Sequence, residues 1–134
     1  MTTTRYLLDT NAASAILRQR EPVCTRAASV PLSALAISSV TAGEMHYGVA
    51  KRPQATALAK LVREFLRYTD ILPWTDAIAP PYGTLRAALE TKGITIAPLD
   101  LMIAAHALAV DATLVSADQA LLRIDILKIE DWSA

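Results

Sequence analysis

The chain has 134 residues, the usual size of one domain, and it is long enough to bury roughly two thirds of the surface that the unfolded chain exposes. Hydrophobic residues make up 53% of the sequence and the mean hydropathy is +0.32, which excludes an intrinsically disordered protein. The formal net charge is zero, although the two halves of the chain carry opposite charges.

Short apolar runs between turn residues predict strands, and apolar residues at helical spacing predict helices. In chain order the predicted elements are a strand at 5–9, helices at 10–18 and 22–29, a strand at 36–39, helices at 41–51 and 54–68, an extended segment at 71–73, helices at 76–92 and 98–110, a strand at 113–116, a short helix from 118 and a strand at 126–129. Strands and helices alternate along the chain. The sequence therefore predicts a single α/β domain over residues 1–134, with a small twisted parallel sheet of four to five strands flanked by helices.

Capping residues set several of these boundaries. The helix at 10–18 begins beside Asp9, Thr10 and Asn11, each of which offers a side-chain acceptor to the free N–H groups of a first turn. The segment Thr41-Ala42-Gly43-Glu44 has the spacing of a capping box, which predicts that the next helix opens there. Thr75 or Asp76 is expected to cap the helix at 76–92, and Pro80-Pro81 is expected to kink that helix or delay its start.

Four acidic residues stand where predicted strands give way to helices: Asp9, Glu44, Asp100 and Asp118. The carboxyl ends of parallel strands meet at one edge of a sheet, where open α/β folds bind their ligands, so these acids are expected to gather there. A site built from carboxylates, with no cysteine pair or histidine cluster, favours Mg²⁺ or Mn²⁺ and phosphate chemistry.

Each acid also has a structural explanation, since Asp9, Asp100 and Asp118 can be helix caps and Glu44 can belong to its capping box. Their joint placement favours a metal site. Two carboxylates ~5 Å apart repel each other by about 3 kcal/mol at an effective dielectric near 20, and a divalent ion relieves that repulsion. Thr10, Asn11 and Ser116 are candidate supporting residues that can orient a carboxylate or a water.

The remaining polar residues favour structural roles. His106 lies in an alanine-rich buried helix, which favours a core or interface residue, and His46 is expected at the surface or in packing. Arg86 and Glu90 have the spacing of a helical ion pair. Trp74 and Trp132 are expected to serve in packing.

The charge distribution indicates a charged partner. Residues 1–68 hold nine Lys and Arg against four Asp and Glu, and residues 69–134 hold four against nine. A basic flank beside an acidic site suits an enzyme that attracts phosphates, although chance placement of solvated side chains explains the pattern equally well.

The lone cysteine, Cys24, excludes an internal disulfide framework. Because no apolar stretch is long enough for a membrane span or a signal peptide, we expect a cytoplasmic protein with no membrane association.

Five ordered segments resemble the PIN-domain toxins, most closely the VapC type. They are Tyr6-Leu7-Leu8-Asp9-Thr10-Asn11, residues 37–49 from Ile37 to Val49, residues 98–108 from Pro98 to Leu108, residues 112–118 from Ala112 to Asp118, and Ile129-Glu130-Asp131-Trp132. Together they span nearly the whole chain in the family's order. Ala117 stands where many relatives carry Asn, so the segment around Asp118 matches least well.

The resemblance implies a PIN-like fold and an endoribonuclease that depends on Mg²⁺ or Mn²⁺. It implies the toxin of a type II toxin-antitoxin system, neutralised by a VapB-like antitoxin and forming a homodimer. By position, Asp9, Glu44, Asp100 and Asp118 become the metal-binding and catalytic acids, and Thr10, Asn11 and Ser116 the supporting residues.

Two alternative functions remain open at this point. A haloacid-dehalogenase-like phosphatase also begins with an Asp at a strand end, but it requires a second Asp two residues later, where this chain has Asn11. A non-catalytic acidic domain that binds a cation for structure or signalling is the other alternative.

Overall fold

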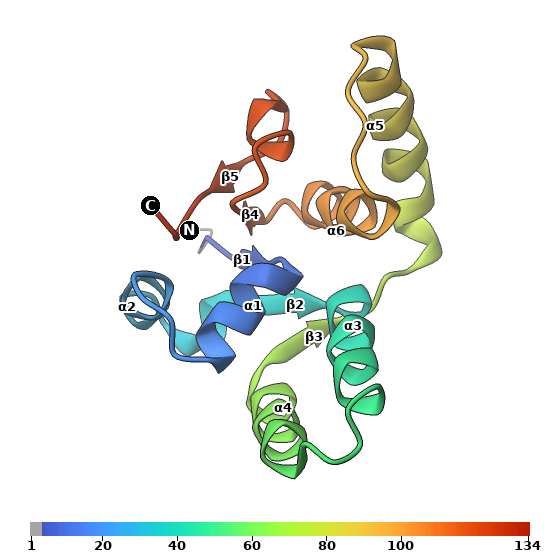
Figure 1. Cartoon of the computed structure of the whole chain (residues 1–134). Coiled ribbons are helices and arrows are strands. Elements are labelled where there is room, and N and C mark those ends of the chain that lie inside the picture. Colours follow the sequence, from blue (N-terminus) through green and yellow to red (C-terminus); the bar gives the residue numbers. More distant parts are fainter. Residues whose placement is uncertain (1–3) are drawn as a thin grey trace.

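The computed structural model describes residues 4–134, which form a parallel five-stranded sheet between two layers of helices (Figure 1). The strands are β1 (Tyr6–Leu8), β2 (Leu35–Ser38), β3 (Asp70–Leu72), β4 (Thr113–Val115) and β5 (Ile129–Glu130), in the spatial order β3-β2-β1-β4-β5. Every neighbouring pair is parallel. This arrangement confirms the predicted fold class.

The helices are α1 (Thr10–Leu17), α2 (Val23–Ala28), α3 (Ser39–Ala50), α4 (Thr56–Tyr68), α5 (Ala79–Thr91) and α6 (Pro98–Ala109), with 3₁₀ turns η1 (Leu32–Ala34), η2 (Asp76–Ile78) and η3 (Leu121–Arg123). Helices α1 to α4 lie on one side of the sheet and α5 and α6 on the other (Figure 1). Within residues 4–134, no helix has both the length and the apolar character that a bilayer crossing requires.

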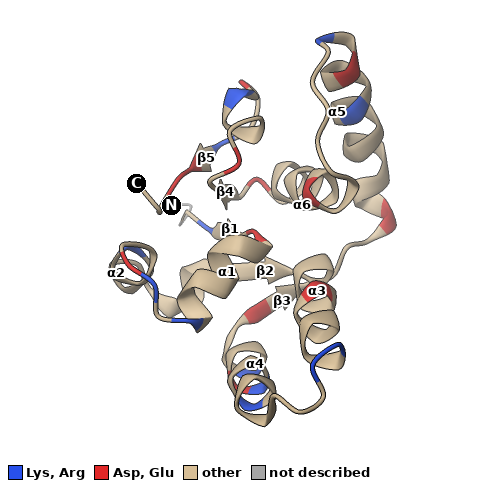
Figure 2. Cartoon of the chain, viewed as in Figure 1, with Lys and Arg blue, Asp and Glu red and all other residues tan. Residues whose placement is uncertain are grey.

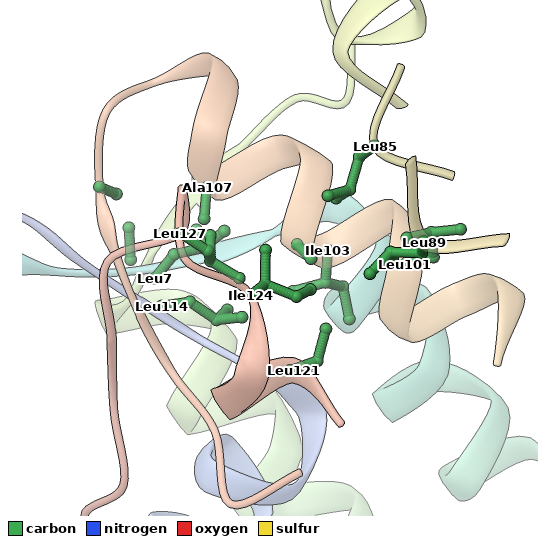
Figure 3. Packing of buried hydrophobic residues seen from close by; sticks show 13 residues of the cluster. Leu7, Leu85, Leu89, Leu101, Ile103, Ala107, Leu114, Leu121, Ile124 and Leu127 are labelled. Carbon is green, nitrogen blue, oxygen red and sulfur yellow. The ribbon is translucent and has the colours of Figure 1, made fainter. Parts of the chain in front are cut away.

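The strand register explains the two layers. Leu7 lies beside Ala36 and Leu114 in one row of the sheet, and these residues pack under α5, α6 and η3 (Figure 3). The next row consists of Leu8, Ile37 and Val115, which pack against α1 to α4. Successive side chains of a strand point to opposite faces, so a sheet covered on both faces needs continuous apolar runs, as these strands have.

The chain reverses its direction across the sheet between β1 and β4. From β1 it moves outward through β2 to β3, and it then returns to place β4 on the other side of β1. Such a topological switch point leaves a crevice at the carboxyl ends of the two strands, because the following connections leave in opposite directions. The carboxyl ends of β1 and β4, where folds of this kind bind their ligands, lie just beyond Leu8 and Val115.

The predicted start of α3 is wrong. The helix begins at Ser39 and is capped by Ser38, whose hydroxyl oxygen accepts the N–H of Val40 at 3.1 Å. Thr41 and Glu44 consequently lie inside the helix and form no capping box. The sequence pattern was ambiguous because Ser38 and Thr41 are both favourable capping residues; the earlier one is used because the sheet ends there.

Other boundaries also differ from the predictions. Helix α5 starts at Ala79, later than the predicted residue 76, and Pro80 and Pro81 lie in its first turn. Neither Thr75 nor Asp76 makes a side-chain cap. The short helix after Asp118 is the 3₁₀ turn η3. The last strand, predicted at 126–129, is β5 at 129–130, because residues 125–127 form a turn first.

Candidate metal and active site

Asp9 stands at the switch point, one residue beyond β1. Its backbone N–H donates to the carbonyl oxygen of Val115 at 3.1 Å, which fixes it against β4. Its carboxylate accepts the N–H of Ala12 at 2.7 Å and so caps α1. The residue is only 7% exposed. Asp9 is therefore both a helix cap and a buried carboxylate at the carboxyl edge of the sheet.

Two serines flank Asp9 at the same level of the sheet. Leu8 is in register with Ile37 and with Val115, so the next residues along, Ser38 and Ser116, stand on either side of Asp9. Both are buried. Each hydroxyl also accepts the N–H two residues later, that of Val40 for Ser38 and that of Asp118 for Ser116.

Glu44 reaches this edge from the second turn of α3. Its Oε1 accepts a 2.6 Å hydrogen bond from the hydroxyl of Thr10, whose oxygen also lies 3.4 Å from the hydroxyl oxygen of Thr41. Thr41 is fully buried and Glu44 is half-buried. Thr10, predicted as a supporting residue, therefore contacts Glu44. Thr41 was not predicted to lie beside these residues.

Asp100 and Asp118 complete the set. Asp100 lies in the first turn of α6, whose capping residue is Ala97. Asp100 is therefore not a helix cap, which was the alternative structural role considered for it. Oδ1 of Asp118 accepts the N–H groups of Ala120 and Leu121 at 2.9 and 3.1 Å. Asp118 therefore caps the turn that leads into η3, whose own capping residue is Ala120. Asp100 and Asp118 are both half-buried.

The pKa values place these carboxylates in one electrostatic field. Burial is the main cause that raises the pKa of Asp9; the hydrogen bonds from Ala12 and Ser116 lower it, and the charges of Asp118 and Glu44 raise it further. Burial also raises the pKa of Asp100, and the charges of the other three acids add to the rise. Acids from four separate elements therefore repel one another across this edge.

The donor set fits a hard divalent cation, because it consists of carboxylate oxygens, the ligands that such ions prefer. For Asp9 and Asp100, burial and like-charged neighbours also raise the pKa, and a bound cation would offset that effect. The acids do not form a closed cage, however. Within residues 4–134, no three Asp, Glu, His or Cys side chains are grouped tightly enough to hold an ion as they stand. The arrangement is an open acidic edge.

The other residues singled out in the sequence divide between surface and core. Asn11 and His46 are exposed, and Asn11 makes no side-chain hydrogen bond to Asp9 among the described residues. Arg86 and Glu90 form the predicted exposed ion pair at 3.1 Å. Trp132 is buried, as expected for packing.

The sequence interpretation missed Ser38 as a site neighbour and gave His106 no specific contact. Nδ1 of His106 lies 2.8 Å from the hydroxyl oxygen of Ser38, and both side chains are buried. The available signal was positional: Ser38 ends β2 at the level where Asp9 follows β1 and Ser116 follows β4.

Comparisons with known proteins agree with this arrangement. Residues 6–127 match the PIN domain family. Ribonuclease VapC2 of Rickettsia felis is 37% identical over 99 residues, which cover 73% of this chain and 74% of that protein. The tRNA(fMet)-specific endonuclease VapC of Shigella flexneri is 28% identical over 130 residues, covering 96% of this chain and 98% of that protein.

Solved structures give the same result for the fold. The structure of VapBC2 from Rickettsia felis bound to a DNA fragment of its promoter contains a chain with a TM-score of 0.87 and 31% identity, covering 96% of this chain and 99% of that one. DNA-bound VapBC from Salmonella typhimurium has a TM-score of 0.87 and 30% identity, over 97% and 99% of the two chains. The chain therefore belongs to the PIN-domain family and, within it, to the VapC-type toxin ribonucleases.

Proposed function

We propose that this chain is a divalent-metal-dependent endoribonuclease whose metal is held by Asp9, Glu44, Asp100 and Asp118. The observation that carries the proposal is the position of Asp9, a buried carboxylate at the switch point within the electrostatic reach of Glu44 and Asp118. A bound Mg²⁺ or Mn²⁺ would neutralise the acids, polarise the scissile phosphate and make a water more acidic.

The residues around the acids have distinct tasks in this proposal. Thr10 holds the carboxylate of Glu44 through its hydroxyl, and Ser116 supports Asp9. The capping bonds of Asp9 and Asp118 each fix one carboxylate oxygen. Positioned groups of this kind orient the substrate and the attacking water without moving during the reaction.

A groove that leads away from the acids supports RNA as the substrate. It begins at Thr10 and Glu44, runs between α1, α3 and α4, and is bordered by Arg18, Lys51 and Arg52. Within residues 4–134, none of these three cations has a carboxylate partner within ion-pair distance. Figure 2 shows Lys and Arg at the end of α1 and at the α3–α4 connection, and both basic and acidic residues on α4. The acidic residues on α3 and α6 and after β1 and β4 are those of the proposed site. The cations that border the groove suit the phosphates that flank a cleaved bond.

We also propose a VapB-like antitoxin as partner and a homodimer as the assembly. The similar structures from Rickettsia felis and Salmonella typhimurium are VapBC complexes. A second groove of about 420 Å³ between α3 and α4, lined mainly by Val49, Val62, Leu66 and Ile71, offers apolar surface to a protein segment. Co-purification with the product of a neighbouring reading frame, and the mass of the free chain in solution, test these two points.

Cleavage of RNA oligonucleotides with and without EDTA tests the proposed function. We expect cleavage with Mg²⁺ or Mn²⁺, loss of cleavage in EDTA, and loss of cleavage in Asp9→Asn. Asp125→Asn is the matched control, since it removes an exposed carboxylate from the turn before β5. A metal-loaded, antitoxin-free protein that cuts no RNA would instead favour the non-catalytic cation-binding domain.

A further inference from the structure

His106 and Ser38 form a buried polar pair beside the acidic edge. The distance from His106 Nδ1 to Ser38 Oγ is 2.8 Å, and the two residues are 1% and 0% exposed. His106 lies on α6, the helix that carries Asp100, and Ser38 caps α3, the helix that carries Glu44. One hydrogen bond therefore joins the two helices that bring acids to the site from opposite layers.

The contacts of this pair fit a neutral imidazole. In the tautomer with an unprotonated Nδ1, the Ser38 hydroxyl donates to that nitrogen while its oxygen accepts the N–H of Val40. The imidazole is then neutral and carries its proton on Nε2. Burial lowers the pKa of His106, which agrees with the neutral form.

A buried imidazole is unfavourable at this position unless its ring nitrogens form hydrogen bonds. Nε2 of His106 is buried and has no hydrogen-bond partner among residues 4–134. An apolar side chain of similar volume would fill the space without an unpaired polar atom. The bond to Ser38 is thus the one polar contact that the ring makes within the described chain.

Trp74 provides a second tie between the same two helices. Its backbone N–H donates to the hydroxyl of Ser39, and its indole N–H donates to the carbonyl oxygen of Met102, both at 3.0 Å. Met102 is one turn before His106 on α6, and Ser39 follows Ser38 at the start of α3. Two independent contacts therefore hold neighbouring turns of α6 to the same end of α3.

We propose that His106 is a positioning residue of the acidic site, which through Ser38 fixes α6 and Asp100 relative to Glu44 and Asp9. The inference rests on the proposed metal-dependent function. Asp100 has no side-chain hydrogen bond of its own among residues 4–134, so its place depends on where α6 lies. Ser38 in turn stands directly beside Asp9 in the sheet register.

The test uses four variants of the chain freed of its partner. His106→Leu removes the bond and keeps the volume, so it is the decisive variant. Ser38→Ala removes the bond from the other side, together with the cap of α3. His106→Asn places an amide oxygen where Nδ1 accepted the proton and should restore the bond. Ile103→Val perturbs the buried face of α6 without removing a polar contact to α3, and it controls for packing.

Two measurements are made on each variant: Mn²⁺ affinity by calorimetry, and amide hydrogen exchange over residues 98–104 without metal. We expect His106→Leu and Ser38→Ala to bind Mn²⁺ about tenfold more weakly, as is typical when a residue that orients a metal ligand is lost. Exchange over 98–104 should accelerate in both, while His106→Asn and Ile103→Val should resemble the wild type.

The inference is overturned if His106→Leu keeps the wild-type Mn²⁺ affinity and exchange rate. It is also overturned if Ile103→Val or His106→Asn reduces the Mn²⁺ affinity as much as His106→Leu does. If the wild type itself binds no Mn²⁺, the proposed function fails, and the exchange data alone test the positioning role. That role is supported if amide exchange over residues 98–104 accelerates only in His106→Leu and Ser38→Ala. Any other exchange result contradicts it.

Discussion

The hydroxyl of Thr10 donates a 2.6 Å hydrogen bond to Oε1 of Glu44, across 34 residues of sequence. This contact joins the first residue of α1 to the second turn of α3, and it exists because α3 starts at Ser39. Had the helix opened at the predicted capping box, Glu44 would have turned back toward its own backbone. The acid is instead held toward Asp9.

Loss of the Thr10–Glu44 hydrogen bond should reduce RNA cleavage without unfolding the protein. Thr10→Val keeps the shape of the side chain but removes the donor, so Glu44 loses its orientation, and we expect kcat/KM for RNA to fall about tenfold. Thr10→Ser, which retains the hydroxyl, should keep most of the activity. Equal activity of the Val and Ser variants would show that the Glu44 contact has no role in cleavage.

Asp9→Asn should abolish cleavage and relieve growth arrest while leaving the fold intact. The amide oxygen can still accept the N–H of Ala12, so the α1 cap is preserved while the buried charge is removed. Circular dichroism and thermal unfolding check the fold, and cleavage of an RNA oligonucleotide checks the activity. An Asn variant that cuts RNA at the wild-type rate would remove Asp9 from the mechanism.

The stability of the metal-free protein should depend on pH through Asp100. The folded-state pKa of this carboxyl is raised above 3.8, mainly by burial. Its protonated form therefore favours folding, and this contribution is present below the ordinary pKa and is lost as pH rises through the raised one. In EDTA at about pH 7, where the ionised Asp100 destabilises the fold, we expect Asp100→Asn to melt a few degrees higher than wild type.

The difference in melting temperature should vanish at a pH well below the ordinary pKa of 3.8, where both side chains are neutral in the folded and the unfolded protein. Added Mn²⁺ should reverse it at neutral pH, because the ion stabilises the carboxylate form only. A melting temperature of Asp100→Asn at or below that of wild type in EDTA near neutral pH would contradict the electrostatic account.

The cations along the groove should affect RNA binding more than chemistry. Arg18→Ala and Arg52→Ala are expected to raise KM several-fold with little change in kcat, since phosphate contacts remote from the acids hold the strand in place. Each lost contact with a single strand should reduce the slope of log K against log salt by about 0.7. Arg123→Ala on η3, outside the groove, is the control. An unchanged salt slope in the groove variants would argue for another path of the RNA.

The fold was predictable because its signals are local. Five short apolar segments that alternate with segments of helical periodicity predict a parallel sheet. Helices cover both faces of that sheet in the structure. Boundaries that depend on competing caps were less predictable. Ser38 and Thr41 offer similar acceptors, and only the end of β2 decides that Ser38 is used.

The sequence alone determined the family, the α/β class and the four acids at strand ends, because periodicity, motif order and residue type are properties of the chain itself. The tertiary structure decided the partners of those acids: the hydroxyl of Thr10 on Glu44, the serines on either side of Asp9, and the link from His106 to Ser38. These contacts join segments 34 and 68 residues apart, and sheet register and helix packing, which no local pattern encodes, bring them together.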